Sequence, residues 1–393
     1  MITIFKGAAV VLENGTEKCD VAVRNGRICD ISKDMETRGA KVIDCEGKYL
    51  FAGFIDLHVH GGGGADFMDG TQKAMETAVR AHLIHGTTTL YPTTMSSEFE
   101  NIRHTVGTYR AFRESGRSPA TLGGLHLEGP FISPAMCGAQ RRDLVYAPGA
   151  EHLSFLRENA DVIARISCAP EVPEVLEMAK ALLPLGIRFS MGHTNATYEQ
   201  AQEAFEAGFG SVTHLYSATS GFHKVNQRVH IGVTQAAYGL EDLYVELIGD
   251  GRHVPKELLR LVVRFKGIGR VCLVTDAMRA AGTDLHESYL GAVCPENRVI
   301  IEDGVAKLPD RSSFAGSIGT MDRALKFAIC EGGLRPFEAS RLASLTPATL
   351  MGIENRKGSI RIGKDADFVL TDEHFDLCGV FVGGEDAFEG AAR

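Results

Sequence analysis

The feature of this chain that most constrains its fold is a repeated alternation of two segment types. Short apolar segments, typical of buried strands, alternate with longer segments in which apolar residues recur every three to four positions, as in amphipathic helices. Because strands separated by helices pair in parallel, eight such units predict an α/β fold, a (β/α)8 TIM barrel over residues 51–354. The predicted strands cover residues 50–57, 87–91, 121–127, 162–168, 187–191, 211–215, 243–248 and 271–274, and predicted helices include 72–85, 172–185, 197–207, 255–265 and 320–330.

The two ends of the chain, residues 1–50 and 355–393, have a different pattern in which apolar and polar residues alternate. Asn14-Gly15 and Asn25-Gly26 interrupt this alternation, as turns of antiparallel hairpins do. Near the C-terminus, segments 359–362 and 367–370 flank a further predicted turn. Each end is too short to form a stable sheet alone. We therefore expect both ends to combine in one small β-sandwich domain, with the barrel inserted between them.

Charge and cysteine usage narrow the class of protein. The formal net charge is −9 and the chain has no run of lysine and arginine, which argues against nucleic acid as a partner. No apolar segment approaches the ~20 residues that a membrane span needs. The nine cysteines are scattered without CxxC spacing, and the first residues lack an apolar signal segment. These features predict a cytoplasmic enzyme with reduced thiols and no membrane association.

Residues able to bind metal follow several of the predicted strands. His58 and His60 end the first strand region, Glu128 the third, and His193 and His214 the fifth and sixth. The carboxyl ends of barrel strands meet at one mouth, and a His-x-His pair there directs both imidazoles to the same side. Imidazole nitrogen and carboxylate oxygen suit zinc or iron better than calcium or magnesium. The five residues therefore predict one or two divalent ions per chain, with Glu128 able to bridge two.

Other polar residues near this mouth have different expected roles. Asp276 follows the eighth strand and is placed to bind or deprotonate the metal-bound water. His126 faces the same side as Glu128, and its role is left open. The glycines at 61–64 lack the GK[ST] ending of a phosphate loop, so we expect them to let the backbone pass close to the metals. Packing or surface positions are expected for His82, His85, His104, His152, His286 and His374.

These segments resemble the amidohydrolase superfamily and, within it, the N-acetylglucosamine-6-phosphate deacetylase family. The likeness covers nearly the whole chain, at residues 53–61, 125–131, 192–197, 213–216, 250–253, 274–278 and 315–317. The most specific of these are Glu-Gly-Pro-Phe at 128–131 and Gly-His-Thr-Asn-Ala-Thr at 192–197. The closing motif Gly-Lys-Asp-Ala-Asp at 363–367 is shared across the superfamily.

The resemblance implies an activity and a division of roles. The reaction would be hydrolysis of the N-acetyl group of N-acetylglucosamine 6-phosphate, giving glucosamine 6-phosphate and acetate. Glu128, His193 and His214 would hold the metal common to the family, and His58 and His60 would add a second site. Asp276 would be the catalytic acid/base. The protein would be a homodimer whose subunits share the substrate pocket, with a small amino sugar phosphate as ligand.

The chain also departs from the family pattern where the substrate is expected to bind. Gln140 follows Gly138-Ala139 where members have histidine, and Ser217-Ala218 replaces Asn-Ala. Arg228 lies in a longer loop, 219–231, instead of preceding Glu-Pro-Gly. These departures keep a related substrate open, such as N-acetylgalactosamine 6-phosphate or another amide. The substrate-binding residues that the resemblance implies are Ala139, Gln140, Ser217, Ala218, Arg228, His253 and Ser317.

Three other classes fit the sequence less well. Hydantoinase-like and dihydroorotase-like enzymes bridge their metals with a carboxylated lysine after the fourth strand, yet residues 162–170 contain no lysine. An adenosine-deaminase-like enzyme would need His-x-x-Glu, which does not begin at His193 or His214. A barrel that had lost its chemistry would lack some of the ligands, and all five are present.

Overall fold

The larger part of the protein is a parallel barrel. A computed structural model describes residues 2–388, and residues 1 and 389–393 of the predicted small domain lie outside this range. Within it the barrel strands are β6 (Phe54–Val59), β9 (Thr87–Thr94), β10 (Thr121–Leu122), β11 (Leu125–Glu128), β12 (Ile163–Cys168), β13 (Arg188–Met191), β14 (Ser211–Val212), β17 (Tyr244–Ile248) and β18 (Val271–Val274). Strands β10 and β11 both pair with β9, and the two form one barrel strand interrupted at Gly123 and Gly124. The predicted barrel is confirmed.

The ring of strands is joined where the first and last strands meet. A parallel bridge links Val59 to Ala277, and the Asp276 N–H donates to the His58 carbonyl over 2.9 Å. The closing segments therefore bring two predicted site residues together through their backbones.

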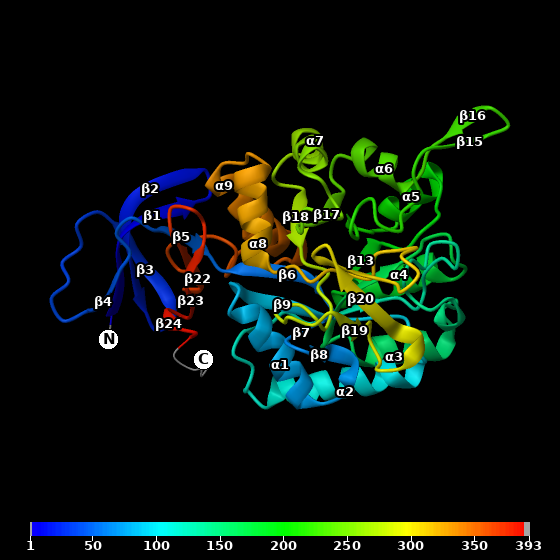
Figure 1. Ribbon diagram of the computed structural model, residues 1–393, viewed down its shortest axis with the longest axis horizontal. Coiled ribbons are helices and arrows are strands. Elements are labelled where there is room, and N and C mark those ends of the chain that lie inside the picture. The colour runs from blue at the N-terminus through cyan, green and yellow to red at the C-terminus, as the bar shows by residue number, and fades with distance from the viewer. Residues whose placement is uncertain (1, 389–393) are drawn as a thin grey trace.

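Helices follow the barrel strands and surround them (Figure 1). They are α1 (Gln72–Leu83), α2 (Phe99–Glu114), α3 (Ala150–Glu158), α4 (Val175–Leu182), α5 (Tyr198–Glu206), α6 (Val233–Gly239), α7 (Lys256–Lys266) and α8 (Met321–Lys326). Their starts follow from local chemistry: the Thr71 side chain accepts the Ala74 N–H, and Thr197 and Gln200 form a reciprocal capping box. A π-helical segment (Phe327–Glu331), α9 (Pro336–Ser340), a second π-helical segment (Arg341–Leu345) and α10 (Thr346–Met351) lead back toward the small domain, and 3-10 turns cover Phe67–Asp69, Arg142–Leu144, Leu183–Leu185 and Pro295–Asn297.

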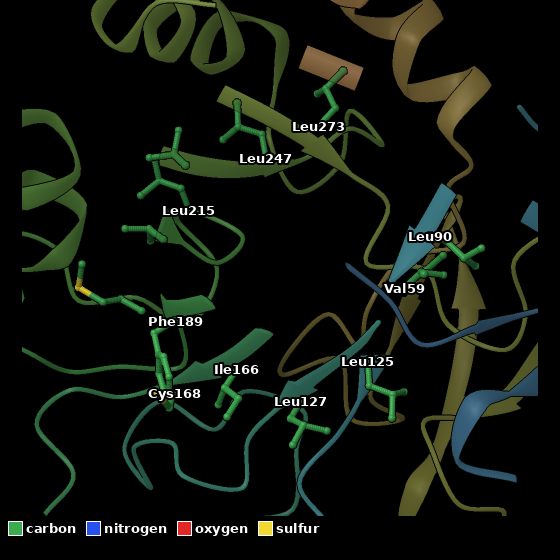
Figure 2. Close-up of a cluster of buried hydrophobic side chains, with 14 of the residues drawn as sticks. Val59, Leu90, Leu125, Leu127, Ile166, Cys168, Phe189, Leu215, Leu247 and Leu273 are labelled. Carbon is green, nitrogen blue, oxygen red and sulfur yellow. The ribbon is translucent and has the colours of Figure 1, made fainter. Parts of the chain in front are cut away.

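The main core lies between the barrel strands and these helices. Figure 2 shows side chains of successive strands gathered in it, including Leu125 and Leu127 of β11. Because successive residues of a strand point to opposite faces, His126 and Glu128, which alternate with these leucines, lie on the other face, inside the barrel. The alternation along the strand thus packs its apolar side chains against the helices and leaves its polar side chains inside the barrel, toward the mouth.

Both chain ends build a second, smaller sheet. It contains β1 (Ile2–Leu12), β2 (Gly15–Arg24), β3 (Arg27–Ser32), β4 (Lys41–Asp44), β5 (Tyr49–Ala52), β22 (Phe368–Thr371), β23 (Leu377–Val382) and β24 (Glu385–Asp386). Strand β1 is irregular between Phe5 and Ala8; it pairs with β4 before this point and with β5 after it. The Phe5 ring packs against Phe368 and Phe381, with centroids 4.9 and 4.8 Å away. The expected sandwich-like domain is confirmed, whereas its boundaries at residues 50 and 355 stay a prediction.

One predicted strand of this domain is wrong. Residues 359–362 form no strand, although 367–370 correspond to β22. The physical reason is that β22 has strand partners on both edges, β5 and β23, so no edge is left for a hairpin neighbour. The intervening loop instead lies beside β3, where the Gly363 N–H donates to the Ile28 carbonyl and the Ile28 N–H to the Lys364 carbonyl.

Three short hairpins or sheets interrupt the loops after barrel strands. They are β7 (Gly61–Gly62) with β8 (Ala65–Asp66), β15 (His223–Val225) with β16 (Arg228–His230), and β19 (Glu287–Tyr289) with β20 (Arg298–Glu302) and β21 (Val305–Lys307). The β15–β16 hairpin projects from the body of the protein beyond α5 and α6 (Figure 1). Within residues 2–388, no helix combines the length and apolar character needed to cross a membrane.

Candidate functional site

Five predicted metal ligands meet at the carboxyl end of the barrel. His58 belongs to β6, Glu128 ends β11, and His60, His193 and His214 follow their strands within one or two residues. Two groups result, His58 with His60 and Glu128, and Glu128 with His193 and His214; within each, ligand atoms lie within 4.8 Å of one another. All five residues are buried. Glu128 belongs to both groups, so it alone connects the two halves of the cluster.

The hydrogen bonds of His193 and His214 test whether a cation fits between these groups. Their Nδ1 atoms lie 2.9 and 3.0 Å from the carbonyls of Met136 and Ser217, which can only accept. Each Nδ1 must therefore carry a proton, and a neutral ring then points the Nε2 lone pair outward. Both Nε2 atoms face Glu128 Oε1, at 3.2 and 2.9 Å. Lone pairs that face a carboxylate repel it unless a cation lies between them, so this donor set fits a divalent metal.

In the second group, two further imidazoles face the same carboxylate. His58 Nε2 lies 3.3 Å from Glu128 Oε1, and His60 Nε2 lies 3.3 Å from Oε2. Burial alone would lower the pKa of both imidazoles, but the carboxylates of Glu128 and Asp276 outweigh it and raise the pKa of His60 to about 9. Burial would raise the pKa of Glu128, yet His58 and His193 hold it well below its usual range. The carboxylates thus favour positive charge here, which a bound ion would supply.

Asp276 faces the cluster from the neighbouring segment that follows β18. Its Oδ1 lies 3.4 Å from His58 Nε2 and 3.3 Å from His60 Nε2. Burial would raise the pKa of this carboxyl, but the two imidazoles lower it further than burial raises it, to about 2. Asp276 is therefore ionised at neutral pH and able to accept a proton.

The backbone at the mouth adopts an uncommon conformation. His193, His214 and Asp276 have φ angles of 48°, 30° and 48°, in the left-handed region that residues other than glycine rarely enter. Such strain persists only where surrounding structure enforces it, and it gathers at functional sites. At each of the three strand ends it accompanies a side chain that faces the cluster.

A pocket of about 340 Å³ opens over this cluster, within the size range of small-molecule sites. Among the residues predicted from the sequence, those that line it are His60, Glu128, Ala139, Gln140, His193, His214, Ser217, Ala218, His253 and Asp276. The pocket thus brings the predicted substrate-binding and metal-binding side chains to one surface.

Gln140 has a role that its sequence position did not reveal. Its side-chain oxygen accepts the Ser96 N–H over 2.8 Å, which fixes the orientation of the amide. The amide nitrogen then donates to Glu128 Oε2, also over 2.8 Å. Gln140 therefore holds the central carboxylate in place as well as lining the pocket.

His253 borders the pocket on another side. Its Nδ1 lies 2.7 Å from Asp250 Oδ2, and its ring packs on Phe314 with centroids 4.8 Å apart. Sequence reasoning missed Phe314, and also Met95 and Leu290, which line the pocket too. They are single apolar residues in loops, and no spacing distinguishes them from ordinary packing residues.

Two predicted substrate-binding residues lie elsewhere. Ser317 is fully buried, does not line the pocket, and donates to the Thr275 carbonyl. Arg228 is exposed on the β15–β16 hairpin and is not among the residues that line the pocket of its own chain. The glycine run also has a more local cause than expected: a Cβ at Gly61 would lie 2.3 Å from the Ala65 carbonyl, so the tight β7–β8 hairpin requires glycine.

Beneath the metal cluster lies a buried ion pair that sequence reasoning also missed. Arg165 of β12 and Glu246 of β17 contact each other inside the barrel. A signal was present, because each is a charged residue in the middle of an otherwise largely apolar strand segment.

Comparison with known proteins agrees with this geometry. The model of the amidohydrolase family matches residues 49–392. The N-acetylglucosamine-6-phosphate deacetylase of Lysinibacillus sphaericus is 33% identical over 95% of each chain. The crystal structure of the Pasteurella multocida deacetylase of the same name superposes with a TM-score of 0.92 at 32% identity, covering 98% of this chain and 99% of that one. A mutant of the Mycobacterium smegmatis deacetylase, solved with N-acetyl-D-glucosamine-6-phosphate, gives 0.88 at 27% identity over the same shares.

Proposed function

This chain belongs to the amidohydrolase family, and on that premise we propose that it removes the acetyl group of N-acetylglucosamine 6-phosphate by hydrolysis. The products are glucosamine 6-phosphate and acetate. The observation that carries the proposal is the meeting of His58, His60, Glu128, His193 and His214 in one cluster at the base of a pocket, in a chain that matches deacetylases over nearly its whole length.

The ligand set supports a zinc or iron cofactor, with one or two ions per chain. Glu128, His193 and His214 would hold one ion, and His58 and His60 would share Glu128 to hold a second. When bound there, such an ion lowers the pKa of water from about 15.7 to about 7 and polarises the amide carbonyl.

The chain's own residues supply the proton transfer. We assign Asp276 as the general base that takes a proton from the attacking water, because its carboxylate is ionised and faces the cluster. The same group then delivers this proton to the departing amine nitrogen, since an amine leaves far more readily once protonated. Gln140 keeps Glu128 in position meanwhile.

The remaining pocket residues would position the sugar. Ala139, Ser217, Ala218 and His253 line the pocket beside the cluster, and Asp250 orients the His253 ring. We assign Ser317 a supporting role through the Thr275 carbonyl, since it is buried away from the pocket. Contacts to the phosphate would hold the acetamide against the ligand cluster without taking part in the reaction.

We further propose a cytoplasmic homodimer in which the β15–β16 hairpin reaches the partner subunit. Phe222 lies just before this projecting hairpin and Val229 lies on it, and the two residues are 62% and 58% exposed. Apolar residues gathered on a projecting element are typical of a surface that a partner covers. Arg228, remote from its own pocket, would then serve the phosphate in the partner's pocket, since a dianion needs cationic partners.

A substrate panel tests the proposal. Acetate release would be measured with N-acetylglucosamine 6-phosphate, N-acetylgalactosamine 6-phosphate and both sugars without phosphate. We expect N-acetylglucosamine 6-phosphate to give the highest kcat/KM. Because Gln140 and Ser217 alter the pocket's hydrogen-bond pattern, a preference for the galacto epimer is the second candidate. Equal rates with and without phosphate would refute the anchoring role, and no acetate from any N-acetylhexosamine would end the deacetylase proposal.

A further inference from the structure

The ion pair between Arg165 and Glu246 is buried to an unusual degree. The two residues are 1% and 0% exposed, and Arg165 Nη1 also donates to the Leu57 carbonyl over 3.0 Å. Removing two charges from water costs so much that apolar residues of similar volume often give equal or greater stability. Stability alone therefore does not account for this pair.

Glu246 faces a metal ligand with its second oxygen. Glu246 Oε2 lies 3.6 Å from His58 Nδ1, and neither atom has a hydrogen-bond partner among the described residues. Both residues are fully buried, so water does not satisfy these atoms from the surface. An acceptor and a potential donor thus face each other just beyond hydrogen-bond distance, and a small rotation of the imidazole brings them together.

The imidazole of His58 differs in this respect from those across the cluster. His193 and His214 direct Nδ1 at backbone carbonyls, whereas His58 directs it at a carboxylate. A carboxylate behind a ligating imidazole fixes the proton on the far nitrogen and raises the basicity of the nitrogen that binds metal. Arg165 holds this carboxylate through its contact with the other oxygen, Oε1.

We propose that Glu246, held by Arg165, is a positioning residue that orients His58 toward the cluster and strengthens binding of the ion shared by His58, His60 and Glu128. This inference rests on the metal site of the proposed function and extends it to residues behind the ligands. On this inference, the Arg165–Glu246 pair affects the affinity for the metal ion rather than the folding of the barrel.

The test measures metal binding directly, without substrate. A single substitution of Glu246 leaves the Arg165 charge buried without its counter-ion, so the informative variant replaces both, Arg165→Met with Glu246→Leu. Glu246→Gln also removes the counter-ion, but its amide oxygen can still accept from Arg165 or from His58, so it provides an intermediate between the wild type and the double variant. Cys272→Ala is the matched control, because Cys272 is buried and lies opposite Glu246 in the β17–β18 ladder.

Metal-free protein would be titrated with Zn²⁺ against a chromophoric chelator, and thermal unfolding would be followed with and without the ion. We expect the double variant to fold with nearly unchanged Tm when metal-free, and to bind the ion at His58 about 10- to 100-fold more weakly. Glu246→Gln should show a smaller loss, and Cys272→Ala none.

Wild-type Zn²⁺ affinity in the folded double variant would overturn the inference, as would an equal loss in Cys272→Ala. So would His58→Ala protein whose zinc binding matches that of the wild type. The zinc titration contains no substrate, so its outcome does not depend on the proposed function. If the protein binds zinc as expected but releases no acetate in the separate substrate assay, only the proposed function is contradicted.

Discussion

At the scale of single residues, the site depends on Glu128. Its two oxygens lie 3.3 Å or less from the Nε2 atoms of four imidazoles. One of these oxygens, Oε2, also accepts a hydrogen bond from the Gln140 amide. The meeting of these five side chains could be predicted because each directly follows a predicted apolar strand segment. Gln140 and Phe314 could not be assigned their contacts in advance, because they reach the site from loops whose path depends on the folded structure.

Replacing Asp276 tests the assignment of the proton acceptor. Asp276→Asn preserves shape and one oxygen but cannot take a proton from water. We expect kcat to fall by about 10²- to 10⁴-fold, the usual contribution of a general acid or base, while zinc content stays near that of the wild type. Steady-state kinetics with elemental analysis would show this. Turnover close to that of the wild type would mean that another group accepts the proton.

At the scale of helices and strands, the regular barrel was predictable and its insertions were not. Long apolar periods locate α1 and α7, since each buries one face over several turns. The β15–β16 and β19–β21 strands are only three to five residues long and largely exposed or half-buried, so they lack a readable alternation. Residues 359–362 alternate correctly, yet β22 pairs with an N-terminal strand, a choice that depends on the folded structure rather than on local pattern.

The β15–β16 hairpin offers a test of the proposal that two subunits share a pocket. Arg228→Ala should raise KM for the phosphorylated sugar by at least about tenfold, because a charged hydrogen bond contributes about 1.5–3 kcal/mol. KM for the unphosphorylated sugar should stay within twofold. Arg298→Ala is the control, since Arg298 is the exposed first residue of strand β20 and its side chain pairs with Glu287 away from the pocket. Equal KM changes for both sugars would rule out a phosphate contact.

Helix α1 contributes a pH dependence through His82. Its Nε2 lies 2.8 Å from the Gly61 carbonyl and the ring is fully buried, so burial lowers its pKa to about 4 from the usual value of about 6.5. The unfolded chain therefore binds a proton at a higher pH than the folded one. The stabilisation is complete above about pH 6.5 and is lost as the pH falls toward 4.

His82→Gln keeps an N–H donor but does not titrate. Between pH 7.5 and pH 5, the free energy of unfolding should fall by about 2 kcal/mol more in the wild type than in this variant, as the difference between the two pKa values requires. Urea unfolding at both pH values measures the difference. Parallel losses in the two proteins would show that His82 does not carry this dependence.

At the scale of the whole molecule, the small sheet and the barrel have different structural roles. The small sheet joins both chain ends through β5 and β22, and the barrel between them presents every strand end to one mouth. That mouth gathers the predicted metal ligands, which are separated by more than 150 residues in sequence, from His58 to His214. We therefore propose that this chain is a metal-dependent deacetylase of an amino sugar phosphate.

Metal titration of turnover tests this claim most directly. Chelator-stripped protein would receive increasing Zn²⁺ while acetate and glucosamine 6-phosphate are measured from N-acetylglucosamine 6-phosphate, together with bound zinc per chain. We expect no product without metal, then equal amounts of both products, with activity reaching its plateau as bound zinc approaches two ions per chain. A plateau at one ion would remove only the second site. Product formation that continues at the same rate after the metal has been removed, or no product from fully loaded protein, would contradict this proposal.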